Sequence, residues 1–190
     1  MRTHRLAVFA LIALGALALA GCYNGNSTAD TEAPVFLSAA ITTGVPEVEM
    51  KTSGDVSIPT ITISSHAKSP SATLSQQQDV ILSEWVVTCS RTDGGTVASP
   101  VWHDFNQTIY VPAGGSAPIT DFTVFPQEYF RQAPLVQLFP ENGGYDKETN
   151  QPGIRQKLHI EVFGKTVAGK KISLPFDINV LFVYEFATTP

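Results

Sequence analysis

Residues 158–182, which read LHIEVFGKTVAGKKISLPFDINVLF, decide the fold. On both sides of a turn around Gly169, large apolar residues occupy every second position: Leu158, Ile160, Val162, Ile172, Leu174, Phe176, Ile178, Val180 and Phe182. Alternation with period two is typical of a β-strand that buries one face. Because a slip of one residue would expose all of these side chains to water, the pattern also sets the pairing register. We therefore expect a long antiparallel hairpin with one buried face.

Three earlier segments carry the same kind of signal. Residues 56–64 (VSIPTITIS) are rich in β-branched residues, and their alternation changes phase at Pro59, which predicts an edge strand or a bulge there. Residues 79–91 (DVILSEWVVTCSR) predict a strand whose turn signal, Thr-Asp-Gly-Gly at 92–95, should reverse the chain. Its expected buried face consists of Ile81, Trp85, Val87 and Cys89. Residues 119–125 predict a further short strand.

The whole pattern indicates an all-β chain. One segment, residues 127–138 (QEYFRQAPLVQL), predicts a short helix interrupted by Pro134. The remaining six to eight short strands with Gly and Pro turns favour an antiparallel immunoglobulin-like β-sandwich over residues 35–190, with that helix as an insertion. The paired cysteines of ordinary immunoglobulin domains are absent, so we expect Trp85 to fill the core between the sheets.

The first 34 residues are of a different kind. Residues 1–21 have two early arginines, an apolar run of about 14 to 16 residues and small residues at the end, which is the pattern of a secretory signal peptide. The run is shorter than the roughly 20 residues that a membrane-spanning helix needs. Residues 22–34 (CYNGNSTADTEAP) show no apolar periodicity, which predicts a flexible tether.

A resemblance adds a location. Leu19-Ala20-Gly21-Cys22 resembles the lipobox of bacterial lipoproteins, and residues 79–95, 126–135 and 158–182 look like uncharacterised bacterial lipoproteins with one immunoglobulin-like sandwich domain. The resemblance implies that Cys22 receives lipid and begins the mature chain, held at the membrane by several acyl chains. Tyr23 stands where the retention rule for inner-membrane lipoproteins looks for Asp, so the resemblance implies the outer membrane. It implies no activity.

Charge excludes one class of partner. The 190 residues are 43% hydrophobic and 15% charged, with a formal net charge of −5. Two of the 12 basic residues, Arg2 and Arg5, lie in the leader, so ten remain against 17 acidic residues and the net charge falls to −7. A protein of that sign repels phosphate backbones, so nucleic acid is not an expected partner. With Cys22 lipidated, Cys89 has no disulfide partner, and its strand position predicts a buried, unreactive thiol.

No catalytic constellation is visible. The mature chain has no Gly-x-Ser-x-Gly elbow, and its three histidines are isolated from one another in sequence: His66, His103 and His159. His103 and Asp104, as neighbours on a strand, would point to opposite faces and could not act together. We therefore expect no catalytic residue, no zinc site and no cofactor.

Two groups of residues are candidates for binding. The first is aromatic and falls in loops or at strand ends, where rings could stack on a sugar or a partner protein, although core packing would explain them as well: Trp102, Tyr110 and Tyr145. The second gathers carboxylates in the polar loop 141–153, where a hard cation such as calcium could bind, although a solvated loop is the simpler explanation: Glu141, Asp146 and Glu148.

Three functions remain open at this point. The leading hypothesis is a non-enzymatic, lipid-anchored envelope protein that binds or scaffolds another envelope component, either a protein or a glycan. A carbohydrate-binding module is the alternative, and it predicts an exposed row of aromatic rings. An envelope hydrolase comes third, since a hydrolase needs a pocket with convergent polar groups and the sequence offers none.

Overall fold

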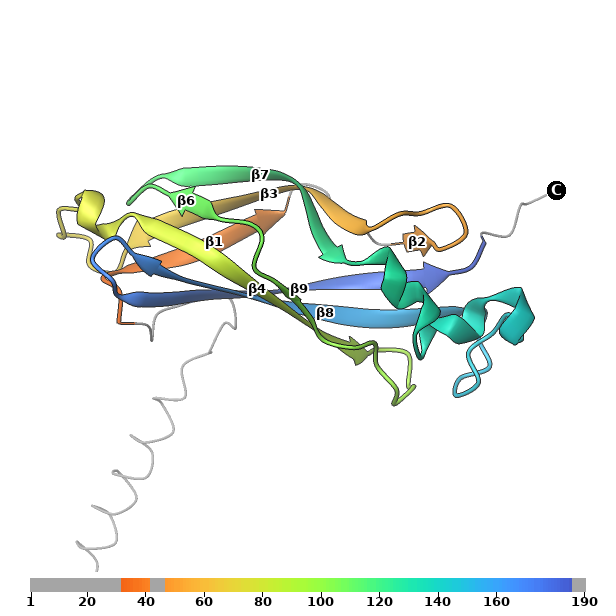
Figure 1. Ribbon diagram of the computed structural model, residues 1–190. Coiled ribbons are helices and arrows are strands. Elements are labelled where there is room, and N and C mark those ends of the chain that lie inside the picture. The colour runs from red at the N-terminus through yellow and green to blue at the C-terminus, as the bar shows by residue number, and fades with distance from the viewer. Residues whose placement is uncertain (1–31, 42–46, 186–190) are drawn as a thin grey trace, which may run out of the picture.

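The computed structural model describes residues 32–41 and 47–185, which form two packed β-sheets (Figure 1). The predicted leader, residues 1–21, lies outside the described residues, as do Cys22 and the predicted tether up to residue 31. The buried core begins at Ala33, which is 1% exposed, two residues before the predicted start of the domain. None of the helices in the described ranges is long and apolar enough to cross a membrane.

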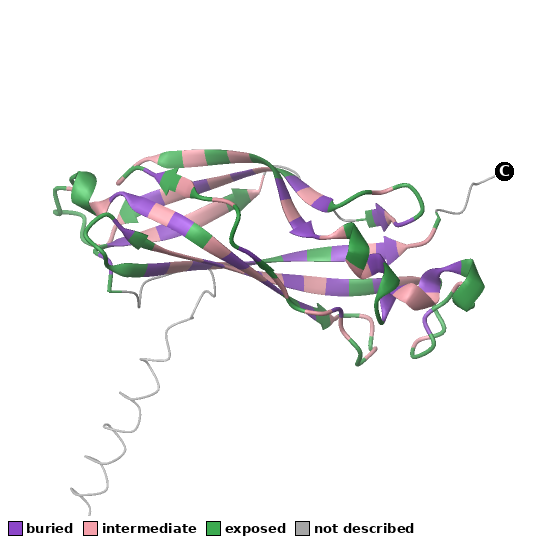
Figure 2. Cartoon of the chain, viewed as in Figure 1, coloured by how far each residue is buried: buried purple, intermediate pink, exposed green. Residues whose placement is uncertain are grey.

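The predicted C-terminal hairpin is confirmed. Strands β8 (Gly153–Thr166) and β9 (Lys171–Val183) pair antiparallel over their whole length, with Ile160 opposite Phe176. Every apolar residue of the expected inner face is buried, from Leu158 in β8 to Phe182 in β9. Figure 2 shows the resulting alternation of buried and more exposed residues along these strands. The hairpin therefore supplies one continuous apolar face.

The order of the strands is that of an immunoglobulin-like sandwich. One sheet has the order β1-β3-β7, formed by β1 (Val35–Ile41), β3 (Val56–Ala67) and β7 (Ser116–Phe125). The other has the order β2-β9-β8-β4-β5, with β2 (Glu47–Glu49), β4 (Val80–Arg91), β5 (Trp102–Asp104) and, also paired with β4, β6 (Ile109–Val111). All pairs are antiparallel except β2–β9. In immunoglobulin terms β1-β3-β7 are strands A, B and E, and β9-β8-β4 are strands G, F and C.

Trp85 fills the core between the sheets, as expected. Its side chain is fully buried on β4, and its ring lies 4.3 Å, centroid to centroid, from that of Phe122 on β7 in the opposite sheet. Cys89, four residues further along the same face of β4, is a free and buried thiol, and burial raises its pKa to about 12. In antibody domains the buried tryptophan of strand C packs against a disulfide, whereas here it packs against the ring of Phe122.

The prediction of the inner face of β4 is partly wrong. Val80 and Leu82 are buried there, and Ile81 instead lies on the outer face. The reason is an irregularity between Leu82 and Glu84, where Ser83 is left without a partner on β8. An extra residue in one strand reverses the alternation on either side of it. Gly164 lies opposite this bulge, and a Cβ there would collide with the backbone of Ile81.

The phase change at Pro59 is confirmed, but β3 is not simply an edge strand, because it lies between β1 and β7. Pairing of β1 ends with Ile41 opposite Ile61, so within the described residues Pro59 has a paired strand only on the β7 side. This position suits a residue that cannot donate to a sheet ladder. On β7 the facing residue, Asp121, has φ 52°, and the burial pattern changes phase there too.

The predicted helix 127–138 forms two separate 3-10 helices rather than an interrupted α-helix. They are η2 (Gln127–Arg131) and η3 (Leu135–Leu138), with a cis peptide bond at Ala133–Pro134, and η4 (Pro140–Asn142) follows directly. A further 3-10 helix, η1 (Gln76–Gln78), precedes β4. Buried Phe130, Leu135 and Leu138 attach this insertion to the core. The insertion thereby belongs to the folded domain.

The two ends of the sandwich differ, as Figure 1 shows. We call the end with Glu32, the β6–β7 turn (112–115) and the β8–β9 turn (167–170) the entry end. The other, the distal end, carries residues 92–101 after β4 and the segment 126–152 between β7 and β8. Because β8 has 14 residues, at about 3.3 Å per residue the two ends lie roughly 45 Å apart. The chain reversal predicted at 92–95 is confirmed, through a loop that returns at β5.

The contact between Trp85 and Phe122 generates a first prediction. The Phe122→Ala variant should lose about 3–5 kcal/mol of unfolding free energy, because the cavity would open between the two sheets. Urea denaturation followed by circular dichroism measures this loss. Phe105→Ala is the matched control, since Phe105 is 63% exposed, and should change stability by no more than about 0.5 kcal/mol. Equal midpoints for the two variants would contradict the packing described above.

Candidate functional site

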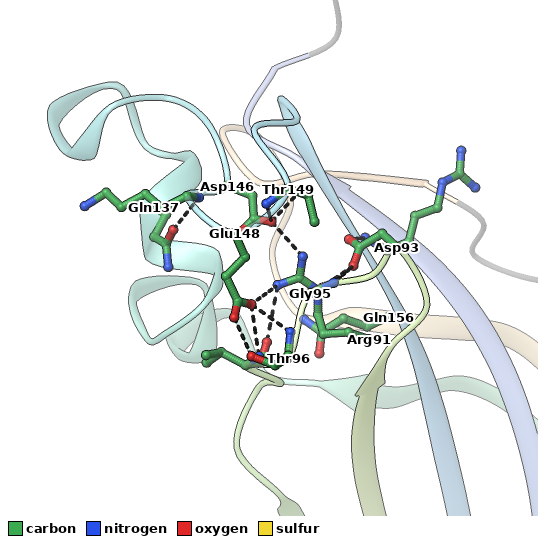
Figure 3. A network of polar contacts seen from close by, with 12 residues as sticks. Arg91, Asp93, Gly95, Thr96, Gln137, Asp146, Glu148, Thr149 and Gln156 are labelled. Atoms are coloured by element: carbon green, nitrogen blue, oxygen red, sulfur yellow. Dashed lines mark hydrogen bonds and ion pairs between the residues drawn. The ribbon is translucent and has the colours of Figure 1, made fainter.

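A buried guanidinium organises the distal end. Arg91 is the last residue of β4, and its side chain is only 1% exposed. Its Nε donates to Asp93 at 2.7 Å and its Nη2 donates to Asp146 at 2.7 Å, while Nη1 lies 3.5 Å from Glu148 (Figure 3). One cation is thus shared by three carboxylates from two different loops. We call these four residues the Arg91 cluster.

Each carboxylate of the cluster also holds backbone. Glu148 accepts hydrogen bonds from the N–H of Thr96 at 2.8 Å and of Val97 at 3.0 Å, and from the Thr96 hydroxyl. Asp146 accepts from both the N–H and the hydroxyl of Thr149. The cluster therefore connects the loop after β4 to the loop before β8.

The strand side of the cluster is equally well bonded. Asp93 accepts from the N–H of Arg155 at 2.8 Å and of Gly95 at 3.2 Å. Gly95 is required here, because a Cβ at this position would collide with the guanidinium of Arg91. Beside the cluster, the fully buried Gln156 accepts from the N–H of Ser99 and donates to its hydroxyl at 2.8 Å. Polar groups removed from water are in this way matched with partners.

The electrostatics favour the ionised carboxylates. For Asp146 burial is the largest single influence and by itself would raise the pKa. The hydrogen bonds from Arg91 and Thr149 and the charge of Arg91 together outweigh it, so the pKa lies below the ordinary value. The pKa of Asp93 is lowered in the same balance between burial and the bonds from Arg91 and the backbone. For Glu148 the Thr96 hydroxyl is the largest cause, followed by backbone N–H groups, and its pKa is lowered too.

The described contacts of the cluster brace two loops against each other. Arg91 offsets one of the three negative charges, so the cluster keeps a net charge of −2, which hydrogen bonds from the backbone and from threonine hydroxyls help to stabilise. Asp146 is fully buried with one oxygen, Oδ1, that lacks a hydrogen-bond partner in the described part of the chain. Glu141, the third calcium candidate, is directed elsewhere and accepts from Arg131 at 2.7 Å. Residues 32–41 and 47–185 contain no group of three or more His, Cys, Asp or Glu side chains placed to hold a metal. The three candidate carboxylates are therefore divided between two arginines.

The aromatic candidates do not form one surface. Tyr110 is 52% exposed and lies opposite Ile81 near the entry end, while Tyr145 is 43% exposed and adjoins Asp146 at the distal end. The ten residue steps along β4 from Ile81 to Arg91 span roughly 33 Å at about 3.3 Å each. Trp102 lies between them, half-buried against the core. The structure thus separates the three rings that the sequence grouped.

The histidines also remain apart. His103 is exposed and Asp104 is buried, so they point to opposite faces of β5, as expected. His159 lies on the solvent face of β8 and its Nδ1 is 2.6 Å from Asp177 on β9. His66 contacts the Ser38 hydroxyl at 2.9 Å on the outside of the other sheet. These contacts are cross-strand surface pairs.

A hollow of about 370 Å³ opens at the distal end, and sequence reasoning did not find it. Its floor is apolar and buried, formed by Met50, Phe130 and Phe139. At its rim the Arg131 guanidinium lies 3.8 Å from the centre of the Phe139 ring. Tyr184 packs edge-on against Phe139 at 5.3 Å. The hollow combines residues from the segment after β2, the 3-10 insertion and the residue that follows β9, so no local sequence signal marks it.

The Arg91 cluster generates a second prediction. Asp146→Asn should lower the free energy of unfolding at pH 7 by about 3 kcal/mol, because it removes one partner of a buried ion pair. The lowered pKa values mean that the folded protein binds fewer protons than the unfolded chain, whose carboxyls titrate near pH 4. The stabilisation is therefore complete above about pH 5 and is lost as the pH falls through the folded-state values.

Urea titrations at several pH values measure this effect. The gap between the wild type and Asp146→Asn should be constant from pH 7 to 5 and should narrow below pH 4. Glu141→Gln is the matched control, because it breaks the exposed pair with Arg131, in which both side chains are more than half exposed, and should leave the midpoint unchanged. A gap that widens on acidification would contradict the sign of the pKa shifts.

Comparison with known proteins adds no relative to this description. A scan of the chain against models of protein families gives no match, and a search of curated proteins gives none either. What the chain shows is therefore a β-sandwich with an anchored insertion, a buried charge cluster and a hollow at its distal end.

Proposed function

We propose that this chain is a lipid-anchored protein of the bacterial cell envelope that binds or scaffolds another envelope component without catalysing a reaction. The leader pattern of residues 1–21, with Cys22 at the end of a lipobox-like stretch, supports the anchor. Tyr23, in place of Asp after the cysteine, supports the outer membrane as its location. The partner would be an envelope protein or a glycan.

The observation that carries the proposal is the separation of the two ends. The described chain begins at the entry end, so an anchor attached upstream of Glu32 would hold that end toward the bilayer. Roughly 45 Å away, as the length of β8 requires, lies the distal end with its apolar-floored hollow. The Arg91 cluster fixes the neighbouring loops without needing a ligand. Such a pre-formed surface binds without the entropy cost of ordering loops.

The anchor is tested by growing cells with labelled palmitate. The wild-type protein should carry the label and sediment with outer membranes, whereas Cys22→Ala should carry none and should leave the membrane fraction. Cys89→Ala is the matched control, because Cys89 is the chain's only other cysteine and is buried; it should be labelled like the wild type. Unlabelled wild-type protein would contradict the proposed anchor.

The binding role is tested by photo-crosslinking in intact cells. A benzoylphenylalanine at Glu128, on the rim of the distal hollow, should give one discrete adduct whose yield falls at least tenfold in the Arg131→Ala variant. The same probe at Thr120, exposed on the outer face of the other sheet, is the matched control and should give no such adduct. Recovery of only the free monomer from the Glu128 probe would contradict a binding role for the distal end.

A further inference from the structure

The charges of this acidic protein are unevenly distributed between its two ends. Of the ten basic residues that follow the leader, four lie at the entry end, where β3 finishes and where β8 turns into β9: Lys68, Lys165, Lys170 and Lys171. Among the residues that the structure describes, the acidic ones at that end are Glu32, Asp79 and Glu84. The described part of the entry end thus carries one more positive than negative charge, although the chain after the leader carries about −7.

Two of these lysines face each other directly. Lys165 and Lys171 are cross-strand partners on the β8–β9 hairpin, so their side chains project from the same face of the sheet, and both are exposed. Among the residues that the structure describes, neither has an ion-pair partner. Like charges placed opposite one another destabilise a sheet. An anionic ligand would turn this repulsion into attraction.

Glu32 and Glu84 line the same hollow as Lys165 and Lys171, but neither forms an ion pair with them. Asp79, a buried carboxylate of the entry end, does not pair with them either. It accepts hydrogen bonds from the Tyr110 hydroxyl and, at 2.7 Å, from the N–H of Ala113. The bond from Tyr110 is the largest cause of its lowered pKa. Asp79 is thus held by the β6–β7 side of the entry end and stays ionised there, while the lysines of the β8–β9 turn extend outward.

The turn between the lysines is apolar at its tip and firmly held. Val167 is 48% exposed at the tip. Its N–H donates to the carbonyl of Asp79 at 2.8 Å, and the N–H of Ala168 donates to the carbonyl of Gln77 in η1 at 3.0 Å. Thr166, which is 1% exposed, closes the turn by donating its N–H to the carbonyl of Lys170 at 2.8 Å. An exposed apolar tip flanked by lysines, on a pre-ordered turn, matches the boundary between headgroups and acyl chains of a bilayer.

We propose that the β8–β9 turn docks onto an anionic lipid surface, with Val167 at the acyl boundary and Lys165, Lys170 and Lys171 among the headgroup phosphates. This inference rests on the proposed anchor, which brings the entry end to the membrane. Glu32 and Lys171 line one hollow of about 720 Å³, so the first described residue lies beside the turn. The ten residue steps from Cys22 to Glu32 reach at most about 36 Å, so the bilayer stays within range.

Docking would give the protein a fixed orientation. A lipid anchor on a tether leaves the domain free to rotate, whereas a second contact at the turn would direct the axis of β8 away from the bilayer. The binding energy of a single polybasic contact is modest, but the tether keeps its effective concentration high. The distal hollow would then face away from the membrane.

Fluorescence quenching tests the proposal on the processed full chain, purified from membranes and reconstituted in vesicles. In a Cys89→Ser background, Val167→Cys labelled with bimane should be quenched by brominated acyl chains in vesicles of phosphatidylglycerol and not in vesicles of phosphatidylcholine. Lys147→Cys, labelled in the same way at the distal end, is the control and should not be quenched in either. High salt should abolish the quenching, because the attraction is electrostatic.

Charge variants make the test quantitative. Lys165→Gln and Lys171→Gln should each lower the ratio of docked to undocked protein about fivefold, and together about 25-fold. Lys147→Gln removes the same charge from the distal end and should change nothing. Equal quenching in the two lipids, or none in phosphatidylglycerol, would overturn the docking.

The same sample reports the anchor separately. The mass of its N-terminal peptide shows whether Cys22 carries acyl chains. A peptide without them would overturn the proposed anchor. A peptide that carries them, in a protein whose turn shows no preference for the anionic lipid, would overturn the docking alone.

Discussion

The structure depends on one constraint, the burial of a single face of the β8–β9 hairpin. Because its apolar residues alternate over the whole length of both strands, only one register keeps them out of water. Strand β4 pairs along one edge of this hairpin and β2 along the other. The second sheet packs on the buried face, where Phe122 meets Trp85. Since the register is unique, the positions of the two ends are determined as well: the β8–β9 turn marks the entry end and the start of β8 marks the distal end.

The Arg91 cluster follows from that register. Arg91 pairs with Gln156 at the distal end of the β4–β8 ladder, which brings its guanidinium between the loop after β4 and the loop before β8. A buried ion pair is not by itself a strong source of stability, since removing the charges from water costs nearly as much as their attraction returns. Its effect here is specific geometry: Glu148 holds the backbone of Thr96 and Val97, and Asp146 holds that of Thr149. The loops beside the hollow are thereby part of the folded domain.

Much of the fold could be predicted from the sequence because period-two alternation is a local signal. It identified the hairpin, the core position of Trp85 and the chain reversal after β4. Where one extra residue interrupts the alternation, as at Ser83, the local signal assigned Ile81 to the wrong face.

The site was less predictable. The sequence pointed to Asp146 and Glu148 as candidate cation ligands. Arg91 lies 55 residues from Asp146, and no feature of either segment predicts contact with the other. The prediction that the aromatic residues form one binding surface was wrong for the same reason, since Tyr110 and Tyr145 lie near opposite ends of β4.

The contacts of the Arg91 cluster imply that the distal loops are held as firmly as the sheet that carries them. Hydrogen exchange, read by NMR, measures this residue by residue. We expect the amides of Thr96, Val97 and Asn150 to exchange as slowly as those of the β8–β9 hairpin. Arg91→Met should accelerate exchange at these three amides while the hairpin amides stay slow. Loop amides that exchange at the rates of an unstructured peptide in the wild type would contradict it.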